Sequence, residues 1–479
     1  MIQLHGSLCP SIANFFVWAS FYSHTFILQP MLHSINEREP ENFGEFDGYY
    51  GLAIACASSM LATIISPCIA NHSTPKWLMV GGSAMLIVYY LLFQAFHRNV
   101  FYAACVILGF GLISFHVGCN DYLYQISPRK SLEYSHPLFW AVSCIGIFCA
   151  SVLYMVLTEV TEQVEIKDNT TFREYSDVEM RCFFGTFTIL TSIAFFALLF
   201  FQMKFRVERK PDKISTTAKN TNRTISNALS VLRDRHVLSL LPFFAYLGLF
   251  FSFWSVIIPT SIHFTEISKD NFFVLAYFIM SFSVGCISTC LLVMFVSQHF
   301  KHFSFLIYWL LVASLELVTL LLSVFIIPEW SSVMHTSEPS LLIQPSIPWI
   351  IVLGVLFGIG EAANNTAKNA VVCTLPPNAR HQGFVICKFY HSLSCAIIFI
   401  LAPFLSIYIL FSACTLFLIL STLIIALRRY LRLKKERREM EPPTNTQLRQ
   451  LKHAKVRVVD SFTHHVEVCT DPNRKQLVY

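Results

Sequence analysis

Charged residues are scarce in this chain of 479 residues, of which only 13% are Asp, Glu, Lys or Arg. An ordinary soluble domain carries roughly 25%, so these charges are too few to cover a soluble protein of this length. Hydrophobic residues make up 54% of the chain, which excludes the disordered, collagen-like and small disulfide-rich classes. The composition predicts a polytopic membrane protein whose first partner is the lipid bilayer.

Patterns that would indicate reaction chemistry are also missing. The 15 cysteines form no C-x-x-C pair and the histidines are scattered, so the sequence predicts neither a metal site nor a disulfide framework. It shows no nucleophile–base spacing and no phosphate loop, so we expect no enzyme and no cofactor. Residues 1–8 hold no Lys or Arg, and the first apolar run is long enough to remain as a span, which argues against a cleavable signal peptide.

Long apolar stretches dominate the rest of the chain. A helix needs about 20 apolar residues to cross roughly 30 Å of hydrocarbon. Twelve such stretches lie at 9–30, 49–70, 77–96, 100–126, 137–158, 182–203, 237–260, 272–298, 303–327, 348–372, 383–400 and 403–427. Little more than Ala402-Pro403 separates the last two, so eleven spans is the alternative. We predict an all-α membrane protein with twelve transmembrane helices.

The basic residues predict the orientation of these spans. If the N-terminus is cytoplasmic, 27 of the 35 Lys and Arg residues face the cytoplasm and 6 face the opposite side, while Lys368 and Lys388 lie within spans. This bias favours two cytoplasmic termini, which requires an even number of spans. Asn169 in the outer 159–181 loop is then a predicted glycosylation site. Plasma membrane and endolysosomal membrane both remain open.

A polar, basic connection at 204–236 divides the spans six and six. We predict an N-terminal half at 1–203, a cytoplasmic linker at 204–236, a C-terminal half at 237–427 and a basic cytoplasmic tail at 428–479. The tail is expected to lie at lipid headgroups and to bind no nucleic acid. At a fixed offset of 249, five residues of the two halves match, namely Gly109 with Gly358, Gly111 with Gly360, Asn120 with Asn369, Pro128 with Pro377 and Ser143 with Ser392. Two pseudo-symmetric six-helix bundles in parallel repeat predict the major facilitator fold.

Polar residues inside the spans are the candidate functional residues. An ionisable side chain in hydrocarbon costs at least ~2.5–3.5 kcal/mol, so it must face protein or water. The 348–372 span holds five polar residues at positions i, i+3, i+4, i+7 and i+8 of one helical face, namely Glu361, Asn364, Asn365, Lys368 and Asn369. Glu361 and Lys368 lie two turns apart, about 10 Å, so they cannot touch directly, but Asn364 and Asn365 could bridge them.

Further candidates lie in other spans, namely Lys388, Glu316, Asn120 and Asp121. Glu361 and Lys388 fit two interpretations: an ion or proton relay in a central polar cavity, or a salt-bridge and hydrogen-bond network that locks the halves. We expect Glu316 to pair with another group or to face the cavity. Asn120 and Asp121 also fit simple polarity at the membrane interface, and the intramembrane histidines His116 and His391 are expected to be packing residues.

Two motif-bearing segments carry a resemblance to a known family. The first is Gly109-Phe110-Gly111 with Asn120-Asp121-Tyr122-Leu123, and the second is Gly358-Ile359-Gly360-Glu361 with Asn365-Thr366 and Lys388-Phe389. Together they resemble the uncoordinated-93 (Unc-93-like) family, a branch of the major facilitator superfamily, over about 14–427. The resemblance implies a non-catalytic regulator, either an accessory subunit of potassium channels or an escort of innate immune receptors.

Departures from the superfamily pattern bear on the choice of function. The superfamily loop Gly-x-x-x-Asp-basic-x-Gly-basic-basic, which helps gate active transporters, is replaced here by Asn-His-Ser-Thr-Pro-Lys at 71–76. Its absence favours a regulator of an ion channel or of receptor trafficking. The polar face of the 348–372 span favours the alternative, an ion- or proton-coupled secondary transporter of a small solute.

Overall fold

The computed structural model describes residues 2–126, 132–164, 174–200, 238–299, 305–373 and 377–440. These residues are helical or irregular, with one isolated β-bridge between Thr265 and Thr336. The helices are α1 (Ile2–Arg38), α2 (Asp47–His72), α3 (Pro75–Phe93), α4 (Arg98–Ile126), α5 (Leu132–Val164), α6 (Asp177–Phe200), α9 (Leu241–Ser252), η2 (Phe253–Ile257), α10 (Ile258–His263), α11 (Ile267–Asp270), α12 (Val274–His299), α13 (Phe305–Ile326), α14 (Ile347–Cys373), α15 (Pro377–Leu401) and α16 (Ile407–Met440).

Ten helical segments of the described residues are long and apolar enough to cross a membrane. The all-α, multi-pass architecture is therefore confirmed, whereas the count of twelve spans stays a prediction. Two predicted spans, those of α1 and α15, are not among the ten. Val385–Leu401 of α15 is a shorter apolar helix, and α1 contains Asn14, His24 and Gln29, all of which are buried. Polar side chains that face the protein interior lower the hydropathy of a span without preventing it from crossing the membrane.

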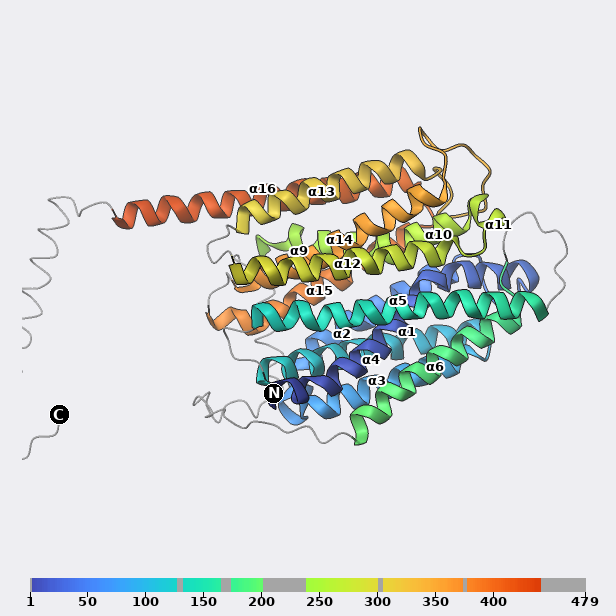
Figure 1. Ribbon diagram of the computed structural model, residues 1–479, viewed down its shortest axis with the longest axis horizontal. Helices are drawn as coiled ribbons and strands as arrows, with labels where there is room; N and C mark the ends of the chain where they lie inside the picture. The colour runs from blue at the N-terminus through green and yellow to red at the C-terminus, as the bar shows by residue number, and fades with distance from the viewer. Residues whose placement is uncertain are drawn as a thin grey trace, which may run out of the picture. The chain divides into compact units, whose positions relative to one another are not determined.

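By compactness the chain divides into two units, Met1–Ile424 and Ile425–Tyr479. Within the first unit we distinguish an N-terminal set, α1 to α6, from a C-terminal set, α9 to residue 424 of α16. Two pairs of helices join the sets side by side, α2 with α15 and α5 with α12 (Figure 1). The predicted linker at 204–236 lies outside the described residues.

The glycines of the sequence repeat occupy equivalent places in the two sets. A Cβ atom on Gly109 of α4 would collide with Ala55 and Ser58 of α2, and one on Gly358 of α14 would collide with the Phe282 carbonyl of α12. A hydrogen bond crosses each contact, from Ser59 Oγ to the Gly109 carbonyl (3.2 Å) and from Cys286 Sγ to the Gly358 carbonyl (3.1 Å). Small residues let helix backbones approach closely in lipid, so each glycine permits the same close packing in its own set.

A π-helical turn, η2, interrupts the helix that corresponds to the 237–260 span. Pro259 lies just beyond it and has no backbone N–H, and its ring would clash with the carbonyl of Ser255 in an unbroken α-helix. The widened turn places Trp254 in the interior, where its side chain is fully buried. Single π-turns occur frequently at functional sites, and Trp254 of this one donates a hydrogen bond to Glu361, a residue of the cavity described below.

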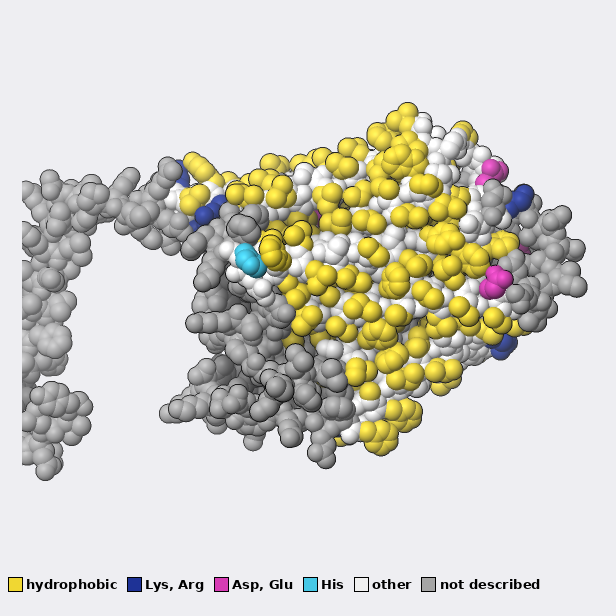
Figure 2. Space-filling model, viewed as in Figure 1, with side chains coloured by type: hydrophobic (Ala, Val, Ile, Leu, Met, Phe, Trp, Pro, Cys, Tyr) yellow, Lys and Arg dark blue, Asp and Glu magenta, His cyan; other side chains and the backbone are white. Residues whose placement is uncertain are grey.

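The outer surface of the first unit matches a bilayer environment. Leu292 and Phe295 of α12 and Leu311 of α13 are 55–61% exposed, although all are large and hydrophobic. Figure 2 shows hydrophobic side chains covering the face between the two ends of the helices, with Asp and Glu and some of the Lys and Arg side chains at the end where α11 lies. A continuous apolar surface of this kind is solvated by lipid rather than by water.

Candidate functional site: a polar cavity between the two helix sets

A cavity of about 110 Å³ lies between the N-terminal and C-terminal sets. A single water needs roughly 10–15 Å³ of this kind of volume, so the cavity can hold several waters or a small solute. Both sets line it, with α1, α2, α4 and α5 on one side and α9, α14 and α15 on the other. The polar side chains of its lining are Cys56, Ser59, His116, Glu361, Asn364, Asn365, Lys368, Lys388, His391, Ser392 and Cys395.

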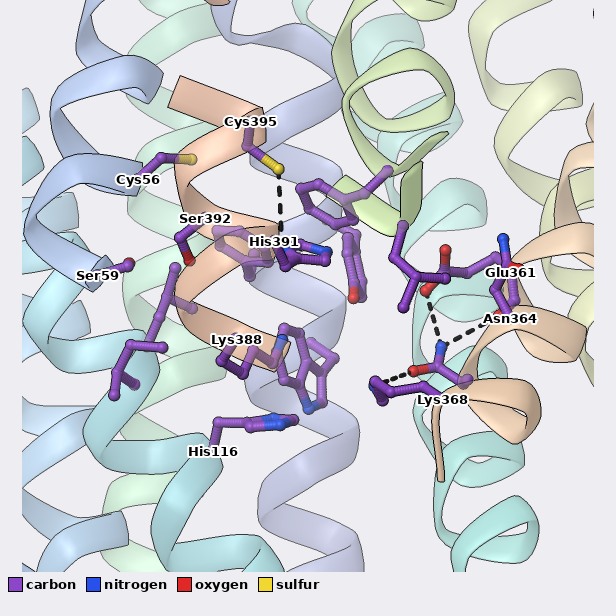
Figure 3. A pocket seen from close by; sticks show the side chains of 18 of the residues that line it. Cys56, Ser59, His116, Glu361, Asn364, Lys368, Lys388, His391, Ser392 and Cys395 are labelled. Atoms are coloured by element: carbon purple, nitrogen blue, oxygen red, sulfur yellow. Dashed lines mark hydrogen bonds between the residues drawn. The ribbon is translucent and has the colours of Figure 1, made fainter. Parts of the chain in front are cut away.

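A chain of hydrogen bonds runs along the cavity face of α14. Glu361 accepts hydrogen bonds from Trp254 Nε1 (2.9 Å) and from Asn365 Nδ2 (2.7 Å). Lys368 Nζ donates to Asn365 Oδ1 at 2.6 Å. The two charges of this helix therefore do not touch, and Asn365 bridges them as the helical spacing predicts. Asn364 lines the same cavity without taking part in the bridge (Figure 3).

Lys388 on α15 differs from Lys368 in having no hydrogen bond or ion pair with any residue of the described ranges. Its side chain is half-buried and lines the cavity. His391, Ser392 and Cys395 follow at i+3, i+4 and i+7 on the same side of α15, and the His391 ring lies 3.7 Å from Cys395 Sγ. Figure 3 shows Lys388 and His391 across the cavity from Glu361 and Lys368. Lys388 thus offers the cavity a cation that no carboxylate of the described residues meets at ion-pair distance.

The N-terminal set contributes an aromatic wall instead of charges. The rings of Trp18 and Tyr22 stack with centroids 5.2 Å apart, and Trp140 meets Trp18 edge-on at 6.0 Å. Tyr22 also contacts Trp254 of the C-terminal set at 5.2 Å, so the aromatic contacts cross between the sets. The indole of Trp18 donates to Asn14. Aromatic rings present large, rigid apolar faces, which suits them to shape the cavity.

The sequence-predicted residues do not all meet here. Glu316 is fully buried within the C-terminal set, where it accepts a hydrogen bond from Tyr246 (2.8 Å), and it is not among the residues that line the cavity. Asn369 contacts the His136 ring of α5 at 3.1 Å. Asn120 and Asp121 are half-buried on α4 outside the lining. The predicted glycosylation site, Asn169, lies outside the described residues.

Two features of the cavity lining were not predicted from the sequence. His116 and His391 were expected to be packing residues, yet both line the cavity. The aromatic wall was not predicted at all, because an aromatic residue in a span usually packs against lipid or core. A signal was present in the pattern around Trp18: it lies near the centre of a predicted span, away from the membrane interface, with Asn14 one helical turn before it.

Comparison with known proteins assigns the family. A family model described as "Ion channel regulatory protein UNC-93" matches residues 39–426. The chain belongs to the UNC-93 family. The resemblance found in the sequence is therefore confirmed over most of the helical part of this UNC-93 family chain. Among curated proteins, no relative of the sequence was found.

Two solved structures of similar architecture are described as transporters. The nucleoside transporter NupG superposes with a TM-score of 0.57 at 11% identity, covering 88% of this chain and 98% of its own. A structure described as giving insight into substrate recognition in proton-dependent oligopeptide transporters superposes with a TM-score of 0.62 at 12% identity. It covers 89% of this chain and 100% of its own. At such low identity the similarity shows the fold alone. It confirms the major facilitator fold for this UNC-93 family member.

Proposed function

We propose that this UNC-93 family protein binds a small anionic solute in the cavity between its two helix sets and carries it across the membrane. Lys388 is the observation that supports this proposal. A charged side chain at this depth is costly unless it is paired or solvated, and no described residue pairs with Lys388. A carboxylate or phosphate group in the cavity would supply the missing partner.

Glu361 is proposed to couple transport to protons or another cation. Its carboxylate is 8% exposed, lines the same cavity and faces Lys388 across it. A solute anion at Lys388 and a proton or cation at Glu361 would then occupy one compartment, which favours their movement together. On this proposal the protein catalyses no chemical reaction.

Uptake into proteoliposomes tests the proposal. The purified full chain is reconstituted and offered labelled monocarboxylates, dicarboxylates and inorganic phosphate, with neutral sugars for comparison. Lys388→Met is expected to lower uptake roughly 30-fold or more, the effect of removing one partner of a buried charge pair. Lys269→Gln removes the same charge from an exposed site on α11 and should leave uptake unchanged. Equal uptake by Lys388→Met and by the unchanged protein contradicts the proposal.

Coupling through Glu361 has its own test. Glu361→Gln keeps an acceptor for Trp254 but loses the titratable carboxyl. We expect solute exchange between the two faces to continue, while accumulation driven by a proton gradient is lost. If Glu361→Gln still accumulates solute, the coupling group lies elsewhere, even if the anion proposal holds.

A second candidate function is regulation of an ion channel, and the description of the matching family supports it. The replaced loop at 71–76 favours it too, since the superfamily pattern that helps gate active transporters is absent there. Co-expression with potassium channels, followed by co-purification and current recording, tests this candidate. A regulator should alter the current equally well with Lys388→Met, because the cavity charge would play no part. Escort of a membrane receptor is tested by the same co-purification.

Both termini are proposed to lie in the cytoplasm, as the excess of basic residues on that side favours. A second glycosylation sequon, Asn222-Arg223-Thr224, lies in the predicted cytoplasmic linker. Glycosidase treatment should then reveal sugar at Asn169 and none at Asn222. Sugar on Asn222 would reverse the orientation. Localisation of the tagged full chain chooses between the plasma membrane and the endolysosomal membrane.

A further inference from the structure

Three potential metal ligands from distant parts of the chain meet at one end of the helices. His33 and Glu37 lie one turn apart on α1, beyond the predicted 9–30 span, and His335 lies in the segment between α13 and α14. One ligand atom of each lies within 4.8 Å of those of the other two. The sequence alone predicts no metal site, because His335 is so far along the chain from the other two.

His33 is the best-defined member of this cluster. It is 6% exposed, and its Nδ1 atom makes no hydrogen bond with any described residue. Glu37 Oε1 lies 3.5 Å from this atom, too far for a good hydrogen bond. The guanidinium of Arg38, the residue after Glu37, forms its ion pair with Asp177 at 2.7 Å. A buried, unsatisfied ring nitrogen therefore points toward a carboxylate.

The third ligand is held in place by its neighbours. Phe264 contacts the rings of both His33 and His335, with centroids 4.9 and 4.5 Å apart. The carbonyl of Phe264 accepts a hydrogen bond from the backbone N–H of Thr336 at 3.0 Å, which fixes the residue next to His335. Ligands that are held before the ion arrives lose little conformational freedom on binding.

We propose that His33, Glu37 and His335 bind a divalent transition-metal ion, most favourably Zn²⁺. Two imidazoles and a carboxylate are a common zinc ligand set, with a water in the fourth position. Ligand atoms at about 2.1 Å from zinc lie roughly 3.4 Å apart at a tetrahedral centre. His33 Nδ1 and Glu37 Oε1 already have this separation, at 3.5 Å. Small side-chain rotations bring the third atom in from within 4.8 Å.

A bound ion would tie the two helix sets together at this end. His33 and Glu37 belong to the N-terminal set, and His335 belongs to the C-terminal set. A second contact between the sets lies in the same segment, where Tyr49 of α2 donates to the Ser332 carbonyl at 2.7 Å. The proposed ion would therefore link the two helix sets at this end, a structural role that goes beyond solute binding in the cavity.

Zinc titration of the purified full chain tests the site without any solute or transport. The tail contains His464, His465 and Cys469, which could bind zinc by themselves, so every protein carries His464→Gln, His465→Gln and Cys469→Ser. We expect one Zn²⁺ per chain, a higher thermal midpoint with zinc, and no such rise with Mg²⁺. Glu37→Gln and His335→Gln should each weaken zinc binding at least roughly tenfold. Loss of a group that only supports a zinc ligand already costs about 10–100-fold in affinity.

The controls separate this site from general histidine binding and from misfolding. His97→Gln removes an exposed histidine outside the cluster and should bind zinc as before. Glu37 is 36% exposed, so its substitution by Gln should leave the metal-free thermal midpoint unchanged. Zinc binding that Glu37→Gln and His335→Gln leave intact overturns the proposal, and so does a stoichiometry near zero. Failure of the uptake assay leaves the zinc result unaffected, so the two proposals are tested separately.

Discussion

The N-terminal and C-terminal helix sets share a packing scheme but build different walls of the cavity. In each set a glycine of the repeat lets one helix approach its neighbour, Gly109 in the first and Gly358 in the second. The N-terminal wall is aromatic and is held by the neutral contacts of Asn14 with Trp18 and Ser143. The C-terminal wall carries Glu361, Lys368 and Lys388. The shared glycine packing gives the two sets the same helix arrangement. The difference between the walls gives the cavity rigid aromatic rings on one side and charged side chains on the other.

The largest effect is expected from removing the polar anchor of each wall. Glu361→Ala strips the acceptor from Trp254 and Asn365 and leaves Lys368 without its bridged counter-charge, at a cost of about 3–5 kcal/mol. Asn14→Ala removes only neutral hydrogen bonds and should cost about 1–3 kcal/mol. Thermal unfolding of the full chain in detergent measures both. Equal losses would show that the two walls are held equally strongly.

The indole donors offer a milder form of the same comparison. Trp254→Phe removes the donor to a carboxylate and should cost about 1.5–3 kcal/mol, whereas Trp18→Phe removes a bond to a neutral amide, worth about 0.5–1.5 kcal/mol. Both variants keep an aromatic ring, so packing losses largely cancel. A larger loss for Trp18→Phe in the same unfolding assay would contradict the assignment of charge to the C-terminal wall.

The glycines test what the two sets share. Gly109→Ala and Gly358→Ala overfill equivalent contacts and should each cost about 1–3 kcal/mol. Gly81 and Gly185 are helical glycines whose added Cβ would meet nothing within 4 Å. Alanine at either should be neutral or stabilising by about 0.5–1 kcal/mol, because glycine weakens a helix. The thermal midpoints of the four variants test these expectations. If Gly358→Ala is tolerated while Gly109→Ala is destabilising, the two glycine contacts are not equivalent.

The two lysines of the C-terminal wall are expected to affect stability with opposite signs. Lys388→Met removes a cation that has no described protein partner, and relief of its desolvation should stabilise the protein by about 1 kcal/mol. Lys368→Met breaks the bond to Asn365 and should destabilise it by about 1.5–3 kcal/mol. Expression yield and thermal midpoint check both. A destabilised Lys388→Met would show that Lys388 is a structural residue.

The helical periodicity of the sequence predicted much of the charged wall of the cavity. The spacing of Glu361, Asn364, Asn365 and Lys368 is a local property of one helix, so their common face and the bridging role of an asparagine follow from the sequence. The position of Glu316 could not be predicted from periodicity. Its partner, Tyr246, belongs to another helix, and only the packing of α9 against α13 decides that Glu316 pairs there and does not line the cavity.

By itself the sequence determined the membrane class, the approximate spans, the repeat and the polar face of α14, because hydropathy and helical spacing act over short stretches of chain. Only the tertiary structure decided that Lys388 lacks a protein partner among the described residues, that Trp18 and Tyr22 face the charges, and that His335 meets His33 and Glu37. Each of these depends on contacts between residues that are distant along the chain, which form only when the two helix sets pack together.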